Sequence, residues 1–241
     1  MVNVSFAIGR FRFNVLRDGD MIQDGFDTDP ERALALSYAA PGKRAALSAL
    51  LGLDDALAAL MRTTTEPAVA QIRLAWWREQ VGALNPSSAI AMPVLDALAR
   101  HVVADGIDAA RLVDIVEGWE ILVEAERMDD AALSAFAEKR GGGLFAIGGE
   151  LLRGSVPRGA GEGWALADLA RHLDADGEAG LARQMATQRS PSGLRWPRET
   201  RALGALAAVA TMNLAIGRDR QPAIASPRRV ARLAWMRLTG R

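Results

Sequence analysis

Two groups of carboxylates are the residues of this sequence best suited to chemistry. They are Asp54 and Asp55, and further along the chain Asp174, Asp176 and Glu178. Two carboxylates four residues apart on a helix share one face and can hold Mg²⁺ between them. At that spacing Asp54 and Asp55 are followed by Ala58 and Ala59, so the first group lacks a metal-binding pair. Its alternative interpretation is a solvent-facing stretch of helix.

The second acidic group has the spacing that the first one lacks. Asp174 and Glu178 are four residues apart and would share a cation if the segment were helical. Gly177 favours a loop instead, and acidic residues near the end of a helix commonly face solvent. Both interpretations stay open at this point.

Adjacent tryptophans mark a second segment of interest. Trp76 and Trp77 point about 100° apart on a helix, so they cannot both face one core. We expect one to pack inside and the other to meet a neighbouring helix, a membrane or a ligand. Arg73 lies four residues before Trp77 and could stack on its ring, while Arg78 lies on another face. The alternative is aromatic packing beside surface arginines.

Glycines interrupt a segment that otherwise has helical periodicity. Gly141, Gly142 and Gly143 are followed by Gly148 and Gly149, and each glycine costs a helix about 1 kcal/mol relative to Ala. A kink, a close approach of another helix or room for a ligand would explain them. Their irregular spacing does not fit a phosphate-binding loop, which also follows a strand.

The residue pattern of segment 227–238 predicts a basic amphipathic helix. It combines apolar and charged positions: Val230, Leu233, Trp235 and Met236 against Arg228, Arg229, Arg232 and Arg237. Such a helix either lies on an anionic membrane surface or docks on the core of its own protein.

Composition predicts the elements that position these residues. Half of the 241 residues are hydrophobic but 5% are aromatic, Cys is absent and there are two His. The dominance of Ala and the scarcity of β-branched residues predict an all-α fold. Without Cys, disulfides, thiolate metal sites and Cys nucleophiles are excluded. The formal net charge of zero gives no basic field for nucleic acid, so we expect no nucleic-acid partner.

Capping residues divide the chain into about ten helices in one bundle-like domain over residues 27–241. The expected helices are 30–40, from 41 through 60, 67–84, 88–104, 108–127, 130–153, 161–172, 177–188, 198–216 and 227–238. Residues 1–26 differ, because Val2, Val4, Phe6 and Ile8 alternate as in a strand. A hairpin, a disordered tail, or an upstream start with Met21 as the true first residue would each explain this segment.

No apolar run in the sequence reaches the roughly 18–20 residues that a transmembrane helix needs. Arg10, Arg12 and Arg17 interrupt any apolar stretch that could serve as a cleavable signal. We therefore expect a cytoplasmic protein, with peripheral contact to the inner membrane as the further option.

Four segments in this order resemble the squalene/phytoene synthase family. They are LALSYAAPGKRAALSALLGLDDAL, EPAVAQIRLAWWREQV, FAEKRGGGLFAIGGELLRG and GWALADLARHLDADGE. The second segment and the closing RLTGR look most like a divergent branch, which includes the sixth mitochondrial complex I assembly factor and its bacterial relatives. The resemblance implies an isoprenoid-synthase fold with a central cavity. Active members condense two prenyl diphosphates head to head, with Mg²⁺ held by two aspartate-rich helices.

The chain departs from this pattern at the metal-binding positions. In the register set by Arg44-Ala45, the two aspartates of the first motif fall on Leu57 and Met61. In the third segment the family's Tyr is matched by Phe136, whereas the small pair is kept as Gly141-Gly142.

The second aspartate-rich motif is half kept. Asp174 and Glu178 match acidic positions, but Ala167 and Ala170 replace the polar residues before them. We therefore expect a degenerate, non-catalytic family member with no cofactor, which binds a prenyl lipid, a membrane surface or a protein partner. An assembly role for respiratory complex I is what the branch implies. The alternative is an active, Mg²⁺-dependent prenyl transferase that condenses two prenyl diphosphates.

Overall fold

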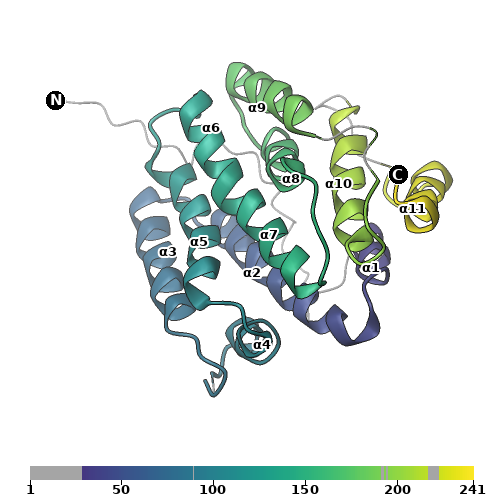
Figure 1. The fold of residues 1–241 in the computed structure, drawn as a ribbon. Helices are drawn as coiled ribbons and strands as arrows, with labels where there is room; N and C mark the ends of the chain where they lie inside the picture. Colours follow the sequence, from purple (N-terminus) through teal and green to yellow (C-terminus); the bar gives the residue numbers. More distant parts are fainter. Residues whose placement is uncertain (1–28, 89, 191–192, 194, 217–222) are drawn as a thin grey trace, which may run out of the picture.

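The computed structural model describes residues 29–88, 90–190, 193, 195–216 and 223–241, so the predicted tail 1–26 lies outside the described residues. Helices make up the ordered elements of this part of the chain, which confirms the all-α prediction. They are α1 (Pro30–Leu36), α2 (Pro41–Thr63), α3 (Pro67–Gly82), α4 (Pro93–His101), α5 (Ala109–Glu124), α6 (Asp130–Phe136), α7 (Gly143–Leu151), α8 (Ala160–Leu169), α9 (Asp176–Arg189), α10 (Arg201–Leu214) and α11 (Pro227–Thr239). Figure 1 shows their arrangement.

The caps of α1, α5 and α6 are those that the sequence predicts, whereas α4 begins at Pro93 rather than at 88 and α10 at Arg201 rather than at 198. The side chain of Asp29 accepts hydrogen bonds from the first backbone N–H groups of α1, and Asp108 and Asp129 do the same for α5 and α6. A proline occupies the first turn of α1, α2, α3, α4 and α11, where its missing N–H costs no hydrogen bond.

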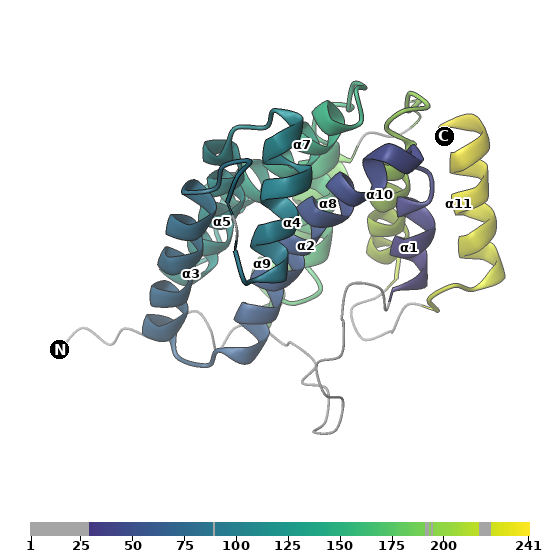
Figure 2. The same cartoon turned by 90° about the horizontal axis from the view of Figure 1, so that it is seen from below.

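Helix α2 runs through the middle of the molecule, with α3, α4, α5 and α7 around one part of it. Leu47, Leu50 and Leu57 of α2 are fully buried in the hydrophobic core. On the other side α8 packs against α9 and α10, and α10 carries α11 at the edge of the molecule (Figure 1; Figure 2). The core thus joins α2 to the C-terminal helices through α7 and α8.

The expected helix 130–153 is divided by one wide π-helical turn, η3 (Ala137–Gly142), between α6 and α7. A Cβ on Gly141 would lie 2.1 Å from the carbonyl oxygen of Gly161 in α8, closer than any real side chain can approach. The glycines therefore permit a close approach of two helices, one of the three explanations given above. This contact fixes the distance between η3 and α8, which face each other across the site described next.

None of the helices in the described ranges is long and apolar enough to cross a bilayer.

Candidate functional site: a cavity closed by ion pairs

A cavity of about 240 Å³ lies between α1, α2, α5, η3, α8 and α10. Its wall carries carboxylates and guanidinium groups in equal measure: Asp29, Asp54, Asp55, Asp168, Arg32, Arg62, Arg140 and Arg171. Opposite charges therefore line the same small cavity. The distances between the carboxylates and the guanidinium groups show which of them form ion pairs.

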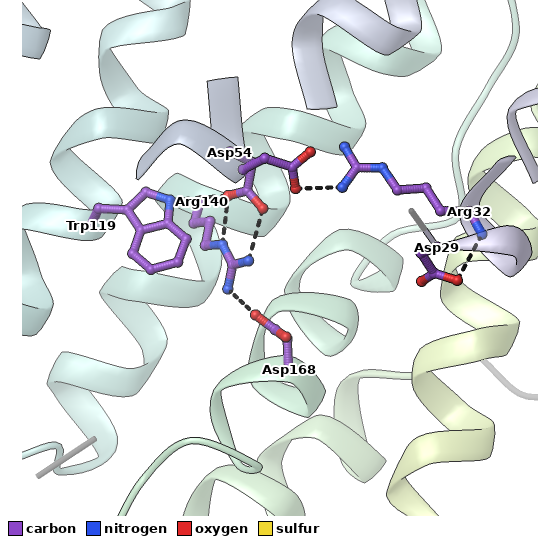
Figure 3. Close-up of polar contacts among 7 residues, drawn as sticks. Asp29, Arg32, Asp54, Trp119, Arg140 and Asp168 are labelled. Atoms are coloured by element: carbon purple, nitrogen blue, oxygen red, sulfur yellow. Dashed lines mark hydrogen bonds and ion pairs between the residues drawn. The ribbon is translucent and has the colours of Figure 1, made fainter. Parts of the chain in front are cut away.

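Arg140 lies at the centre of this arrangement and is 3% exposed. Its Nε and Nη2 donate to the two carboxylate oxygens of Asp54, at 2.7 and 2.8 Å, and its Nη1 donates to Asp168 Oδ2 at 2.8 Å. The indole Nε1 of Trp119 donates a further hydrogen bond to Asp54 Oδ1, at 3.0 Å. Figure 3 shows the guanidinium of Arg140 between the two carboxylates. One arginine thus joins α2 to α8 through η3.

Aromatic rings surround the guanidinium of Arg140. Its Cζ lies 4.3 Å from the ring centre of Trp119, 4.9 Å from that of Trp164 and 5.5 Å from that of Phe136. The faces of these rings attract the cation and exclude water from it. Phe136, which lacks the hydroxyl of the expected Tyr, is part of this apolar wall.

The ion pairs determine the protonation states of the cavity. Burial alone would raise the pKa of Asp168, but the charge of Arg140 and the neighbouring His172 hold it well below its usual value. Burial would likewise lower the pKa of Arg140, and the charges of Asp54 and Asp168 raise it above its usual value instead. The carboxylate of Asp168 and the guanidinium of Arg140 therefore stay charged at neutral pH and neutralise each other.

Asp55 has its own partner on α1. Its side chain forms an ion pair with Arg32. Burial raises the pKa of Asp55, and Asp54 next to it adds to this shift, whereas Arg32 and Arg62 oppose it. Both carboxylates of the first acidic group are therefore ion-paired.

The structure corrects one prediction for α2. Asp54 does not face solvent: it is 5% exposed and bound to Arg140. Leu57 and Met61, on which the register set by Arg44-Ala45 places the two aspartates of the first motif, both belong to the core. Asp54, Asp55 and Ala58 line the cavity. Among the described residues of α2, Leu57 and Met61 do not line it.

The second acidic group lies elsewhere. Asp176 begins α9, Asp174 precedes it, and Glu178 Oε1 accepts a hydrogen bond from the backbone N–H of Met128. Gly177 lies in the first turn of α9, so the loop interpretation fails for this residue, but Asp174 lies before the helix, so Asp174 and Glu178 do not form a pair on one helical face. None of these three described carboxylates lines the cavity.

Sequence reasoning missed the residues that α8 and its end contribute to the cavity: Asp168, Arg171 and His172. The signal was present, because Asp168 and His172 are four residues apart and His172 Nε2 lies 3.6 Å from Asp168 Oδ1. Burial lowers the pKa of Arg171, which the nearby Asp168 opposes. Arg140 was missed as well, since its partners lie 86 and 28 residues away in the chain.

The tryptophan pair behaves as its spacing predicts. Trp77 is buried and Trp76 is 41% exposed, with the two rings edge to face. Arg73 donates a hydrogen bond to the Thr64 hydroxyl. In the described structure its guanidinium does not stack on the ring of Trp77. Arg78 forms an ion pair with Glu120. This segment is a packing element of α3, away from the cavity.

An all-α protein with opposed carboxylates from α2 and α8 around one central cavity has the architecture of an isoprenoid synthase. The chain matches the squalene/phytoene synthase family over residues 27–235 and belongs to it. No curated protein and no solved structure matches the chain significantly.

Members of this family typically use Mg²⁺, so the carboxylates must be tested for fit. Mg²⁺ takes oxygen ligands in octahedral geometry, commonly one or two carboxylates together with phosphates and water. Both oxygens of Asp54 accept hydrogen bonds from Arg140, and Asp168 is bound to the same guanidinium. In the part of the chain that the structure describes, no group of three or more His, Cys, Asp or Glu is placed to hold a metal ion. The residues present do not fit Mg²⁺.

Proposed function

We propose that this protein is a non-catalytic member of the squalene/phytoene synthase family that acts by binding another protein. The role we propose is assembly of respiratory complex I, which the resemblance of its second segment and closing residues to the assembly-factor branch implies.

One observation carries the non-catalytic part of this proposal: Arg140 occupies the space between the two opposed carboxylates. Prenyl diphosphate ionisation needs a cation that neutralises the departing diphosphate. Here a guanidinium on η3 already neutralises Asp54 and Asp168. Recruiting Mg²⁺ would require breaking a buried bidentate ion pair, which costs about 3–5 kcal/mol when one partner loses the other.

The size of the cavity supports the same conclusion. Pockets that bury a single drug-sized ligand have volumes of roughly 300–1,000 Å³, and this cavity holds about 240 Å³. Two prenyl diphosphates need more space than one such ligand. The side chains of Arg140, Trp119 and Trp164 line this cavity and limit the space left for a ligand.

The test of the non-catalytic part is diphosphate release from farnesyl and geranylgeranyl diphosphate, with and without Mg²⁺. We expect no metal-dependent release from protein whose circular dichroism spectrum and cooperative thermal unfolding show that it is folded. Mg²⁺-dependent release that disappears in Asp54→Asn and persists in the exposed control Asp130→Asn would contradict the proposal. It would instead support the active transferase.

The assembly role is tested in cells. A strain that lacks the gene should contain less assembled complex I, measured on native gels and as NADH:ubiquinone oxidoreductase activity of its membranes. Expression of the Asp55→Asn variant should restore both, because no step of the proposed role uses this carboxylate. Unchanged complex I in the deletion strain would overturn the assembly role and leave the non-catalytic part standing.

A further inference from the structure

Helix α11 turns one face to the protein and the other to solvent. The inner face consists of Arg229, Leu233 and Met236, all buried. Arg229 forms a bidentate ion pair with Glu31 of α1, with both nitrogen–oxygen distances at 2.6 Å. Behind the helix, the backbone N–H of Trp196 donates to the carbonyl oxygen of Gly240 at 2.7 Å. These contacts fix the rotation of α11, so its other face cannot turn inward.

The outer face of α11 carries an apolar stripe. Its members are exposed and lie on one side of the helix by their spacing: Ala231, Ala234, Trp235 and Leu238. Leu238 is 74% exposed and Trp235 57%. Covering such exposed apolar side chains with another apolar phase removes them from water and is therefore favourable.

Arginines border this stripe on both sides. Arg228 and Arg232 lie along one edge and Arg237 along the other, by the same helical spacing. Residues 223–241 contain no acidic side chain.

Arg232 donates a hydrogen bond to the carbonyl oxygen of Arg241, at 2.6 Å, and the guanidinium of Arg237 lies 5.4 Å from the ring centre of Tyr38. No Asp or Glu of the described residues forms an ion pair with these three arginines, so their charges are not neutralised by a carboxylate side chain. Figure 2 shows α11 at the edge of the molecule. Trp235 and Arg232 also line a pocket between α11, α10 and α8, so this side of the stripe borders the protein.

We propose that the outer face of α11 binds the surface of a bilayer that contains anionic phospholipids. The helix would lie in the plane of the interface. Trp235 and Leu238 would reach the boundary between the headgroups and the acyl chains, and the arginines would bind the lipid phosphates. A tryptophan at headgroup depth and basic residues beside an apolar stripe are the features of interfacial helices. This function is independent of the proposed assembly role.

The charge of segment 1–17 argues against this segment as the occupant of the face. The apolar positions of segment 1–17, outside the described residues, are interspersed with Arg10, Arg12 and Arg17 and no acidic residue. This segment would therefore be repelled by a face bordered by arginines. A continuous anionic surface complements both edges of the stripe at once, and each basic residue near such a surface contributes about 1 kcal/mol.

A second exposed apolar patch provides the comparison that the test needs. Ile72, 71% exposed, and Trp76, 41% exposed, lie on the outer side of α3. They match Leu238 and Trp235 in residue class, but acidic Glu66 and Glu79 lie on the same helix or at its start. The α3 patch thus has apolar exposure with a mixed border, in which the basic Arg73 and Arg78 are accompanied by Glu66 and Glu79.

The experiment is sedimentation of the full chain with vesicles, at low and high salt. We expect binding to vesicles that contain phosphatidylglycerol, little binding to pure phosphatidylcholine, and loss of binding at high salt because salt screens exposed charges. The double variant Arg228→Glu/Arg232→Glu should bind at least tenfold more weakly. Arg127→Glu/Arg158→Glu, which changes the net charge equally at exposed sites elsewhere, should bind as the wild type does.

A second pair of variants tests the apolar stripe. Trp235→Ser/Leu238→Ser should weaken binding to the anionic vesicles, whereas Ile72→Ser/Trp76→Ser should not. Circular dichroism and thermal unfolding must show that all four double variants remain folded.

Three results would overturn the proposal: no binding of the wild type to either vesicle, equal binding to both, or equal losses in the α11 variants and their controls. Tighter binding to an acidic polypeptide or to DNA than to the anionic vesicles would assign the face to that partner instead. A negative result here leaves the assembly role untouched, because that role is measured as complex I content.

Discussion

The cavity and the outer face of α11 use arginine in opposite ways. In the cavity, Arg140 is buried and each of its charged nitrogens donates to a carboxylate. On α11, Arg228 and Arg232 are exposed; Arg232 donates to the backbone carbonyl of Arg241, and no Asp or Glu of the described residues forms an ion pair with either. Pairing turns the first region into a cross-link between helices, and the lack of pairing leaves the second region able to bind an anion. The residue type is the same, so its surroundings decide its role.

The comparison also separates stability from binding. Removing a buried charge leaves its partners desolvated and unpaired, which is costly to the fold. Removing an exposed charge changes the free energy of unfolding by little. We therefore expect substitutions in the cavity to lower stability and substitutions on α11 to alter binding alone.

The largest expected effect is that of Arg140→Met, which removes the cross-link of the cavity. It leaves Asp54 buried without its cation, so the free energy of unfolding should fall by about 3–5 kcal/mol. Urea denaturation measures this loss. Combining the change with Asp54→Asn should recover part of it, because the buried charge is then gone.

Arg100→Ala is the control for this prediction. Arg100 pairs with Asp96 one helical turn away on the surface of α4, and such pairs contribute about 0.3–0.5 kcal/mol. If Arg140→Met cost no more than Arg100→Ala, the ion pairs of the cavity would not be what holds α2 and α8 together.

Glu31→Gln should come next, because it weakens the ion pair that fixes α11. A hydrogen bond to a charged group contributes about 1.5–3 kcal/mol. Burial would raise the pKa of Glu31, but Arg229 and the Ala225 N–H lower it below its ordinary value of 4.5. The contribution of Glu31 is therefore complete above pH 4.5 and is lost as the pH falls through the lowered pKa.

The pH dependence gives this prediction its measurement. The difference in urea midpoint between wild type and Glu31→Gln should be constant near neutral pH and should narrow in acid. Glu126→Gln, at an exposed loop position, should follow the wild type throughout. A difference that widened in acid would have the wrong sign and would exclude the ion pair as its cause.

Gly161→Ala tests the close approach that brings Asp168 to Arg140. Its Cβ would lie 2.1 Å from the carbonyl oxygen of Gly141, so α8 must move away from η3. Overpacking of this kind costs about 1–3 kcal/mol, measured by urea denaturation. Gly180→Ala in α9 meets nothing within 4 Å and should instead stabilise the protein by about 0.4–1 kcal/mol. Equal effects of the two changes would show that the glycine contact does not position the site.

The smallest effect on stability is expected for Arg228→Glu/Arg232→Glu. Both side chains are exposed on the outer face of α11, so the free energy of unfolding should change by less than about 0.5 kcal/mol per site. Thermal unfolding checks this value in the same preparations used for vesicle binding. A large loss of stability would mean that these arginines hold the helix in place, contrary to the comparison.

Local chemistry made the fold predictable from the sequence. Asp29, Asp108 and Asp129 cap helices because their side chains satisfy N–H groups two or three residues away. The division of Trp76 and Trp77 between surface and core follows from helical geometry alone. Such signals lie within a few residues of the structure that they specify.

The site depends on contacts that no local pattern contains. The burial of Asp54 requires Arg140, 86 residues later, and a chain of 241 residues offers many arginines as candidates. The sequence around two adjacent carboxylates on a helix is the same whether the carboxylates face solvent or a guanidinium that is distant in the chain. Asp168 was missed for the same reason, since its partner Arg140 lies 28 residues earlier in the chain.

A crystal structure grown with Mg²⁺ and a non-hydrolysable farnesyl diphosphate analogue tests the central claim most directly. We predict that Arg140 still bridges Asp54 and Asp168, with no cation on either carboxylate and no analogue in the cavity. A structure with Arg140 turned away and Mg²⁺ bound between these carboxylates and the diphosphate would contradict the claim and restore the site to catalysis.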